Sequence, residues 1–257
     1  MPDIEKIKQE LLPQLGYQPD EIKSFDSIEP VRTLEFPTIP SSATGLAPFI
    51  DHTILKADAL PVSIYKLCDE ADEYGFASVC INPVYVELAK NQLEDSSVKV
   101  CTVVGFPLGA TTEEAKAFET QSALKDGADE IDMVIPIGLL KSGMYTQVYE
   151  EILMLKRICG ESLLKVIIET CYLTDEEKVK ACLIAKAAQA DYVKTSTGVG
   201  PRGAEVDDVK LMRSVMGPKF GVKAAGGIRD SIVAMAMVEA GATRIGASAG
   251  VSIVTGE

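Results

Sequence analysis

The chain has 257 residues, of which 47% are hydrophobic and 25% are charged, a size and balance that fit one α/β barrel domain. Its formal net charge of -13 argues against nucleic acid or an anionic membrane as a partner, because no basic stripe is available to neutralise phosphates. No apolar run reaches the roughly 18 residues of a membrane span, and no basic segment followed by an apolar one opens the chain, so we expect a cytoplasmic protein.

The cysteines and the single histidine do not indicate a metal site. No two cysteines form a C-x-x-C motif, and most of them lie in apolar runs, where cysteine behaves as a small hydrophobic residue. His52 is most simply a core residue. We therefore expect no metal, no cofactor and no disulfide. The six cysteines are Cys68, Cys80, Cys101, Cys159, Cys171 and Cys182.

Residues 1–45 differ in pattern from the rest and are predicted to form an N-terminal extension. Ile4, Ile7 and Leu11 recur at helical spacing until Pro13, and three prolines then interrupt residues 30–40. We expect a short helix followed by an extended arm. The arm is either a partly ordered tail, a plug at the bottom of a barrel or part of a subunit contact. Residues 46–257 are predicted to form the barrel domain.

From Pro48 onward, eight strand-like runs alternate with helix-like segments, although little chain remains for a helix after the last run. Runs of Val and Ile without strict alternation are typical of parallel strands that are buried on both faces. Thr111 and Glu114 have the spacing of a capping box, and so do Thr174 and Glu177. The pattern predicts a (β/α)8 TIM barrel with a short N-terminal helical extension, rather than an open sheet. The expected strands span residues 49–52, 77–81, 98–104, 130–135, 164–169, 191–195, 221–225 and 243–247.

Two lysines lie inside strand-like apolar runs, Lys194 in the sixth run and Lys223 in the seventh. A charged side chain in such a run is costly unless it is paired or exposed. Lys194 is therefore either the exposed end of a strand or half of a buried ion pair, or it is an amine nucleophile kept partly neutral so that it can attack a carbonyl. The second lysine in the same setting favours the chemical interpretation.

The fourth and fifth strands add charged candidates. Asp132 lies within the apolar run of strand four, whereas Asp129 and Glu130 stand at its entry and are predicted to lie at the bottom of the barrel. Lys165 and Glu169 are predicted to share one face of strand five. Because barrel active sites lie at the carboxyl ends of the strands, one carboxylate facing several lysines there indicates a proton-transfer site.

Glycine-rich loops are expected after the last two strands, at 226–229 and 246–250. Glycines let backbone N–H groups converge on an anion, and barrels often hold phosphate after strands seven and eight. Tight turns are the alternative interpretation, because glycine is common in turns.

Seven short motifs occur in order along the chain: Ile50-Asp51-His52-Thr53, Val79-Cys80-Ile81-Asn82-Pro83, Val104-Gly105-Phe106-Pro107-Leu108-Gly109, Gly127-Ala128-Asp129-Glu130-Ile131-Asp132, Leu164-Lys165-Val166-Ile167-Ile168-Glu169-Thr170, Lys194-Thr195-Ser196-Thr197-Gly198 and Lys223-Ala224-Ala225-Gly226-Gly227. With them, the span from about Ile50 to the C-terminus resembles the deoxyribose-phosphate aldolases, a family of lysine-dependent aldolases. The resemblance implies metal-independent, reversible cleavage of 2-deoxy-D-ribose 5-phosphate to acetaldehyde and D-glyceraldehyde 3-phosphate in deoxynucleoside breakdown.

The resemblance also implies roles for single residues. Lys194 would form the Schiff base, Asp132 would move protons, and Lys223 would perturb the Lys194 amine. One departure is Ala249, which stands where a second serine is usual. Another is the loop Val199-Gly200-Pro201-Arg202-Gly203, which replaces the glycine-rich stretch of some relatives. The remaining implied contacts are Asp51, Thr53, Cys80, Lys165 and Thr197 with the substrate, and Gly198, Gly226, Gly227, Gly246 and Ser248 with its phosphate.

Two alternatives stay open at this stage. One is another lysine-dependent or transaldolase-like barrel that acts on a different phosphorylated sugar. The other is a non-catalytic barrel that binds a phosphosugar as a sensor, because one fold can host many functions. The expected partners are a small phosphorylated aldose and acetaldehyde, and we expect a homo-oligomer, either a dimer or a tetramer.

Overall fold

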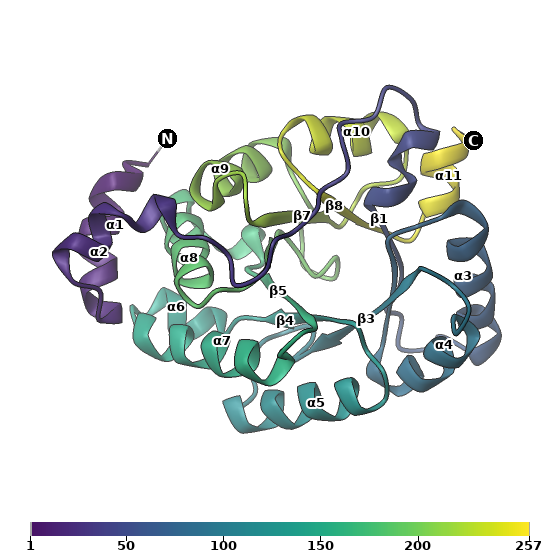
Figure 1. Ribbon diagram of the computed structural model, residues 1–257, viewed down its shortest axis with the longest axis horizontal. Helices are drawn as coiled ribbons and strands as arrows, with labels where there is room; N and C mark the ends of the chain where they lie inside the picture. The colour runs from purple at the N-terminus through teal and green to yellow at the C-terminus, as the bar shows by residue number, and fades with distance from the viewer. Residues whose placement is uncertain (1, 257) are drawn as a thin grey trace.

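The structure is a computed structural model that describes residues 2–256. Eight parallel strands follow one another in chain order around a closed barrel, and the last strand pairs with the first (Figure 1). The predicted (β/α)8 barrel is confirmed. The strands are β1 (Ile50–Ile54), β2 (Ser78–Ile81), β3 (Lys99–Val104), β4 (Glu130–Val134), β5 (Leu163–Ile167), β6 (Tyr192–Lys194), β7 (Gly221–Ala225) and β8 (Arg244–Ala247).

The strand predictions were accurate to about two residues, and the ends of β1 and β5 differ most, of which β5 matters for the site. The expected strand runs to Glu169, but β5 ends at Ile167. Glu169 instead has a φ of 52°, in the left-handed region that non-glycine residues rarely adopt. The regular alternation of side chains therefore stops before Glu169, so this residue does not share a strand face with Lys165.

Helices surround the barrel and cover the outer face of the strands (Figure 1). Thr174 and Glu177 form the predicted capping box. The Thr111–Glu114 box was wrong, because Thr112 is the N-cap of its helix and accepts a hydrogen bond from the N–H of Ala115, whose side chain cannot bond back. The helices are α1 (Ile4–Leu11), α2 (Pro19–Lys23), α3 (Pro61–Tyr74), α4 (Val86–Gln92), α5 (Glu113–Lys125), α6 (Ile137–Lys141), α7 (Tyr145–Cys159), α8 (Asp175–Ala187), α9 (Val206–Met216), α10 (Ser231–Glu239) and α11 (Gly250–Thr255).

The N-terminal extension packs on the outside of the barrel. Helix α1 lies against α8, and the 3-10 turn Leu12–Leu15 that follows it lies against α7. Leu12 and Phe25 are fully buried in the main apolar core. The ammonium of Lys186, on α8, lies over the Phe25 ring at 5.4 Å from its centroid, an attractive cation–π distance. The helical part of the extension is therefore an integral layer of the fold.

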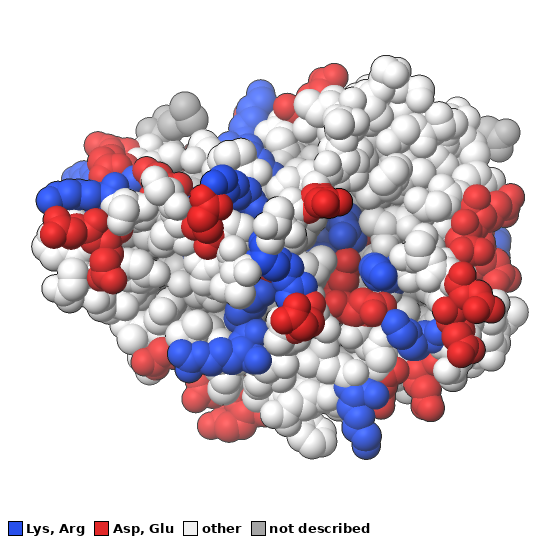
Figure 2. Space-filling view, viewed as in Figure 1, with Lys and Arg blue, Asp and Glu red and all other residues white. Residues whose placement is uncertain are grey.

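The arm of the extension, which follows its helices, lies across the amino end of the barrel, as one of the three interpretations of the sequence predicted. Phe36 contacts the ring of Tyr192, the first residue of β6, edge to face at 6.1 Å. Arg32 donates a 2.9 Å hydrogen bond to the carbonyl of Gly160 and lies 3.5 Å from the carboxylate of Asp191, in the connections that lead into β5 and β6. Figure 2 shows acidic and basic side chains gathered in the hollowed centre of the face shown.

The strands place apolar and charged residues on opposite faces. Along β4, Ile131 and Met133 join the core between the sheet and the helices, whereas Glu130 and Asp132 face the barrel interior, where they meet side chains of other strands.

His52 is buried between Phe76 and Glu70, as the core interpretation predicted. No helix within residues 2–256 has the length and apolar character needed to cross a membrane.

Candidate active site

Strand register brings the predicted catalytic residues together inside the barrel. Asp132 on β4 pairs in register with Lys165 on β5, and Lys194 on β6 pairs in register with Lys223 on β7. Residues directly opposite one another on neighbouring strands point to the same face. All four side chains are buried. A set predicted from four separate motifs therefore forms one contiguous cluster.

Asp132 is the centre of this cluster. Its Oδ2 accepts hydrogen bonds from Lys194 Nζ at 2.9 Å and from Lys223 Nζ at 2.7 Å. Its Oδ1 accepts from Lys165 Nζ at 2.8 Å and from the thiol of Cys101 at 3.1 Å. Burial by itself would raise the pKa of Asp132, but the three lysine charges hold that pKa well below its usual value. Asp132 is therefore an ionised base in contact with both strand lysines.

Lys223 is held more firmly than Lys194. It bonds both Asp132 and Asp51, and although its burial opposes the charge, these two carboxylates raise the pKa of Lys223 above its usual value. Lys223 is thus a fixed cation that shares one carboxylate oxygen with Lys194. In the described part of the chain, Lys194 contacts a single carboxylate, whereas Lys165 and Lys223 each contact at least two.

The barrel interior has more basic than acidic groups. Three carboxylates face four basic side chains, so one positive charge remains uncompensated when all seven are ionised. Buried charge without a partner is costly, and the loss of one proton would balance the cluster. Lys194 has the fewest carboxylate contacts of the four basic groups, which fits the role of the amine that reacts. We call this set the interior charge cluster: Asp51, Glu130, Asp132, Lys165, Lys194, Lys223 and Arg244.

Two members of the interior charge cluster were not predicted as site residues. Arg244 was not singled out at all, and Glu130 was assigned only to the bottom of the barrel. Arg244 bridges Asp51 at 2.5 Å and Glu130 at 3.0 Å, and Glu130 lies 2.5 Å from Lys165. Glu130 does stand at the strand entry, as predicted, but it points into the barrel interior. The alternation of side chains along β8 was the available signal. Arg244 stands at the first position of the strand and points to the same face as Gly246, which was already a predicted site residue.

Arg244→Met is expected to lower the free energy of unfolding by about 3–5 kcal/mol, because it leaves Asp51 and Glu130 without their buried partner. Urea unfolding followed by circular dichroism measures this loss. Arg229 is exposed, so Arg229→Met should change stability by less than about 0.5 kcal/mol. Equal, small effects of the two substitutions would show that the Arg244 contacts do not stabilise the fold.

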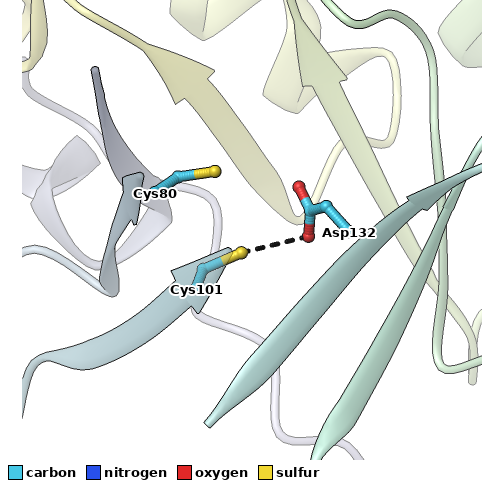
Figure 3. A group of neighbouring side chains, drawn as sticks. All are labelled: Cys80, Cys101 and Asp132. Atoms are coloured by element: carbon cyan, nitrogen blue, oxygen red, sulfur yellow. Dashed lines mark hydrogen bonds between the residues drawn. The ribbon is translucent and has the colours of Figure 1, made fainter. Parts of the chain in front are cut away.

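Two predicted substrate contacts, Thr53 and Cys80, lie on neighbouring strands, and Cys80 is beside Asp132. Cys80 on β2 is fully buried and pairs in register with Thr53 on β1 and with Cys101 on β3. The sulfurs of the two cysteines and an oxygen of Asp132 lie within 4.8 Å of one another (Figure 3). A metal ion bound there would share Asp132 with three ammonium groups. That repulsion makes the group a poor metal site despite its donor atoms.

Glu169 holds the segment that follows Lys194. Its Oε2 accepts hydrogen bonds from the backbone N–H of Thr197, at 3.1 Å, and from the Thr197 hydroxyl. The left-handed backbone at Glu169 directs its buried side chain toward this segment, which a regular strand would not do. Glu169 therefore acts as a support for Thr197.

The glycine loops after β6 and β7 contact one another. The N–H of Ala204 donates to the carbonyls of Ala225 and Gly226, at 3.1 and 3.0 Å. Gly226 has a φ of 88°, and a Cβ there would lie 3.0 Å from the Cα of Gly203 and 3.2 Å from the Cα of Gly198, so the close approach of the loops requires glycine at 226. Gly198 and Gly227 are exposed where the two loops meet, at what we call the glycine seam. The two loops thus present adjacent backbone at one end of the barrel.

The β8 residues predicted for phosphate lie at different depths. Gly246 is buried within β8, where a Cβ would lie 3.1 Å from the Lys223 side chain, so it makes room for that lysine. Ser248 follows β8 and is exposed.

Arg202, in the loop after β6, bonds Glu205 at 2.6 Å and Asp208 at 2.9 Å, so its charge is already matched by carboxylates.

Comparison with known proteins identifies the family. The DeoC/LacD family of aldolases matches residues 46–255, which contain every residue of the interior charge cluster. The chain belongs to this family. A protein from Thermoanaerobacter sp. named deoxyribose-phosphate aldolase is 60% identical over 213 residues, which cover 82% of this chain and 96% of that protein. The aldolase expected from the seven motifs is confirmed at the level of the family.

Solved structures agree with this assignment. A proposed deoxyribose-phosphate aldolase from Coccidioides immitis is 38% identical, with a TM-score of 0.84 over 97% of both chains. A deoxyribose phosphate aldolase from Aeropyrum pernix, described as a tetramer, is 35% identical, with a TM-score of 0.79 over 84% of this chain and 92% of that one. Because the Coccidioides match spans nearly the whole chain, the similarity extends beyond the barrel into the N-terminal extension.

Proposed function

We propose that the chain catalyses the reversible cleavage of 2-deoxy-D-ribose 5-phosphate to acetaldehyde and D-glyceraldehyde 3-phosphate through a Schiff base on Lys194. The names of its relatives support this substrate. The observation that carries the proposal is the pair Lys194 and Lys223 on one oxygen of Asp132, since a protein that only binds sugar phosphate would not need it. The reaction belongs to the breakdown of deoxynucleosides.

In the proposed mechanism, the unprotonated Lys194 amine adds to the C1 aldehyde of the open-chain sugar. Loss of water gives an iminium, which is an electron sink. The 3-hydroxyl then gives up its proton and the C2–C3 bond breaks, releasing glyceraldehyde 3-phosphate and leaving an enamine. Protonation of the enamine at C2 and hydrolysis release acetaldehyde and restore the amine.

Asp132 is the proposed proton carrier for these steps. It is ionised and touches Lys194, so it can accept a proton and return it without a large movement. Lys223 keeps its charge and holds Asp132 in place through the oxygen that both lysines share. Lys165 supports the same carboxylate from its other oxygen. The proposed substrate contacts Asp51, Thr53, Cys80 and Thr197 complete the site.

The phosphate is proposed to bind at the loops after β6, β7 and β8. Gly198, Gly226 and Gly227 supply backbone N–H groups at the glycine seam, and Ser248 supplies a hydroxyl. Gly246 lies deeper, within β8, and contributes indirectly because it leaves space for the Lys223 side chain. A dianion at this end of the barrel would place the aldehyde carbon of the sugar deeper, toward Lys194.

Ser248→Asp tests this phosphate site. A carboxylate facing the dianion, together with the lost charge-assisted hydrogen bond, should cost about 2–4 kcal/mol, or roughly 30- to 1,000-fold in kcat/KM for 2-deoxyribose 5-phosphate. The slower cleavage of unphosphorylated 2-deoxyribose should change by less than about threefold, because that sugar brings no dianion to the loop. Steady-state kinetics with both sugars on both proteins gives the ratio.

The ratio cancels general damage to the barrel. Ser248→Asn has nearly the same size as the aspartate but no charge, so it should lose far less activity toward the phosphorylated sugar. Equal losses for the two sugars in Ser248→Asp would show that Ser248 does not face the phosphate.

The reaction itself is tested by following triose phosphate released from 2-deoxyribose 5-phosphate. The purified chain should release one equivalent each of acetaldehyde and glyceraldehyde 3-phosphate, with no added metal. The same protein should not cleave fructose 1,6-bisphosphate at a comparable rate. A preference for another phosphorylated sugar would replace the proposed substrate while leaving the lysine chemistry in place.

The setting of the reaction is also proposed. All six cysteines have free thiols, which suits the reducing cytoplasm. The net charge of -13 argues against nucleic acid as a partner. A relative is described as a tetramer, and we propose that this chain likewise forms a homo-oligomer.

A further inference from the structure

We propose that Cys80 and Cys101 form a peroxide-reactive thiol pair that closes to a disulfide inside the barrel. The pair lies beside Asp132 and outside the steps of the aldolase mechanism (Figure 3). The proposal rests on the proposed function in one respect. The route by which a sugar phosphate reaches the nearly buried Lys194 would also admit a peroxide, which is smaller.

The geometry of the two strands brings the thiols together. Cys80 on β2 and Cys101 on β3 are direct register partners, so their side chains point to the same face. Neighbouring strands lie about 4.8 Å apart, within the roughly 4.4–6.8 Å that separates the Cα atoms of a disulfide. The two sulfurs lie within 4.8 Å of each other, and Figure 3 shows both directed toward the Asp132 carboxylate. A bond between them needs rotation of the side chains and a small approach of the strands.

The surroundings give the two thiols different reactivity. The neighbouring Cys101 thiol, together with the charges of Lys223 and Lys194, lowers the pKa of Cys80 to about 7. Burial and the neighbouring Cys80 raise the pKa of Cys101, which therefore stays protonated. The thiolate is the form that attacks a peroxide. Burial raises the pKa of the other four cysteines, Cys68, Cys159, Cys171 and Cys182.

Two balanced steps follow from this arrangement. The Cys80 thiolate attacks one oxygen of hydrogen peroxide, the O–O bond breaks, and hydroxide leaves as the sulfur becomes a sulfenic acid. Cys101 then attacks the Cys80 sulfur, the S–O bond breaks, and water leaves with the thiol proton of Cys101. In sum, two thiols and one peroxide give one disulfide and two waters. A dithiol reductant reverses the change.

The disulfide would disturb the catalytic carboxylate. Cys101 donates its S–H to Asp132 at 3.1 Å and accepts a hydrogen bond from Lys165 at 3.2 Å. A disulfide has no S–H, so Asp132 loses this donor when the bond forms. The rotation also moves Cys80 away from its place beside Asp132. Oxidation should therefore lower aldolase activity reversibly.

The test treats the full-length protein with a small molar excess of hydrogen peroxide near pH 7.5 and maps its cysteines under non-reducing conditions. Trypsin cleaves after Lys66, Lys90 and Lys99, so Cys80 and Cys101 fall in different peptides. The first of these peptides also contains Cys68, so fragmentation of the joined peptide shows which of the two cysteines is bonded. We expect one joined peptide, a loss of two hydrogen atoms from the intact mass, and at least about a tenfold loss of activity, since positioned acid–base groups contribute about 10²–10⁴ in rate. Dithiothreitol should restore both.

Two variants sharpen the result. In Cys101→Ala the sulfenic acid has no partner thiol, so Cys80 should gain two or more oxygens, and activity, normalised to the untreated variant, should not return with dithiothreitol. Cys171→Ala should behave as the unaltered chain. The proposal is overturned by an unchanged mass, by a joined peptide that contains Cys171, or by a joined pair that leaves activity intact. Because the peptide map needs no turnover, it tests the pair even if the proposed substrate is wrong.

Discussion

Lys194→Ala is expected to reduce aldolase activity by about 10⁵- to 10⁶-fold, the scale seen when a covalent nucleophile is removed. The iminium cannot form without the amine, so no electron sink is available for breaking the C2–C3 bond. The fold should survive, because the substitution removes the uncompensated charge from the interior charge cluster and leaves Asp132 bonded to Lys165 and Lys223. Release of triose phosphate from 2-deoxyribose 5-phosphate measures the loss.

A matched control separates the nucleophile from lysine content in general. Lys210 is exposed on α9 at 63% of its side-chain area, and Lys210→Ala should leave activity unchanged. Circular dichroism on all three proteins checks that the fold is the same. Activity of Lys194→Ala within about a hundredfold of the unaltered chain would contradict the assignment of Lys194.

Asp132→Asn is expected to lower kcat by about 10²- to 10⁴-fold, the usual contribution of a positioned acid–base group. Asparagine keeps the size of the side chain but cannot carry a proton between Lys194 and the substrate. It also leaves two carboxylates for four basic groups, so a lower stability should accompany the slower rate. Rates are therefore measured well below the unfolding midpoint of the variant, and Schiff base formation is followed separately because it should persist at a reduced rate.

Asp129→Asn is the matched control for this result. Asp129 stands just before β4, partly exposed, and pairs with Lys90 at 2.9 Å rather than with the interior charge cluster. The same substitution there should leave kcat within about twofold, as is usual for sites away from the chemistry. Near-normal turnover of Asp132→Asn would instead transfer the proton-carrying role to water.

Much of the barrel could be predicted from the sequence because its strands have a simple physical signature. Runs of Val and Ile that are buried on both faces predict parallel strands, and the pattern located all eight to within about two residues. The error at Glu169 has a non-local cause. No pattern of hydrophobicity indicates that a charged residue after β5 will adopt left-handed backbone, because that conformation is stabilised by contacts with Thr197, far along the chain.

Most residues of the interior charge cluster could be picked out from the sequence, but their contacts with one another could not. Alternation along one strand places Asp132 and Lys194 on inward faces, yet it does not say at what depth each side chain lies relative to the next strand. That depth depends on the tilt and stagger of the strands, which only the closed barrel fixes. For this reason the contacts of Arg244 and Cys101 were not predicted, although both residues touch ones that the sequence had singled out.

Trapping of the Schiff base tests the central claim most directly. The protein is incubated with acetaldehyde and sodium borohydride, which reduces an iminium to a stable secondary amine, and its peptides are then mapped. We predict one two-carbon adduct per chain, located on Lys194, and none in Lys194→Ala. An adduct located on Lys165 or Lys223 instead, or no adduct at all in a correctly folded protein, would contradict the account.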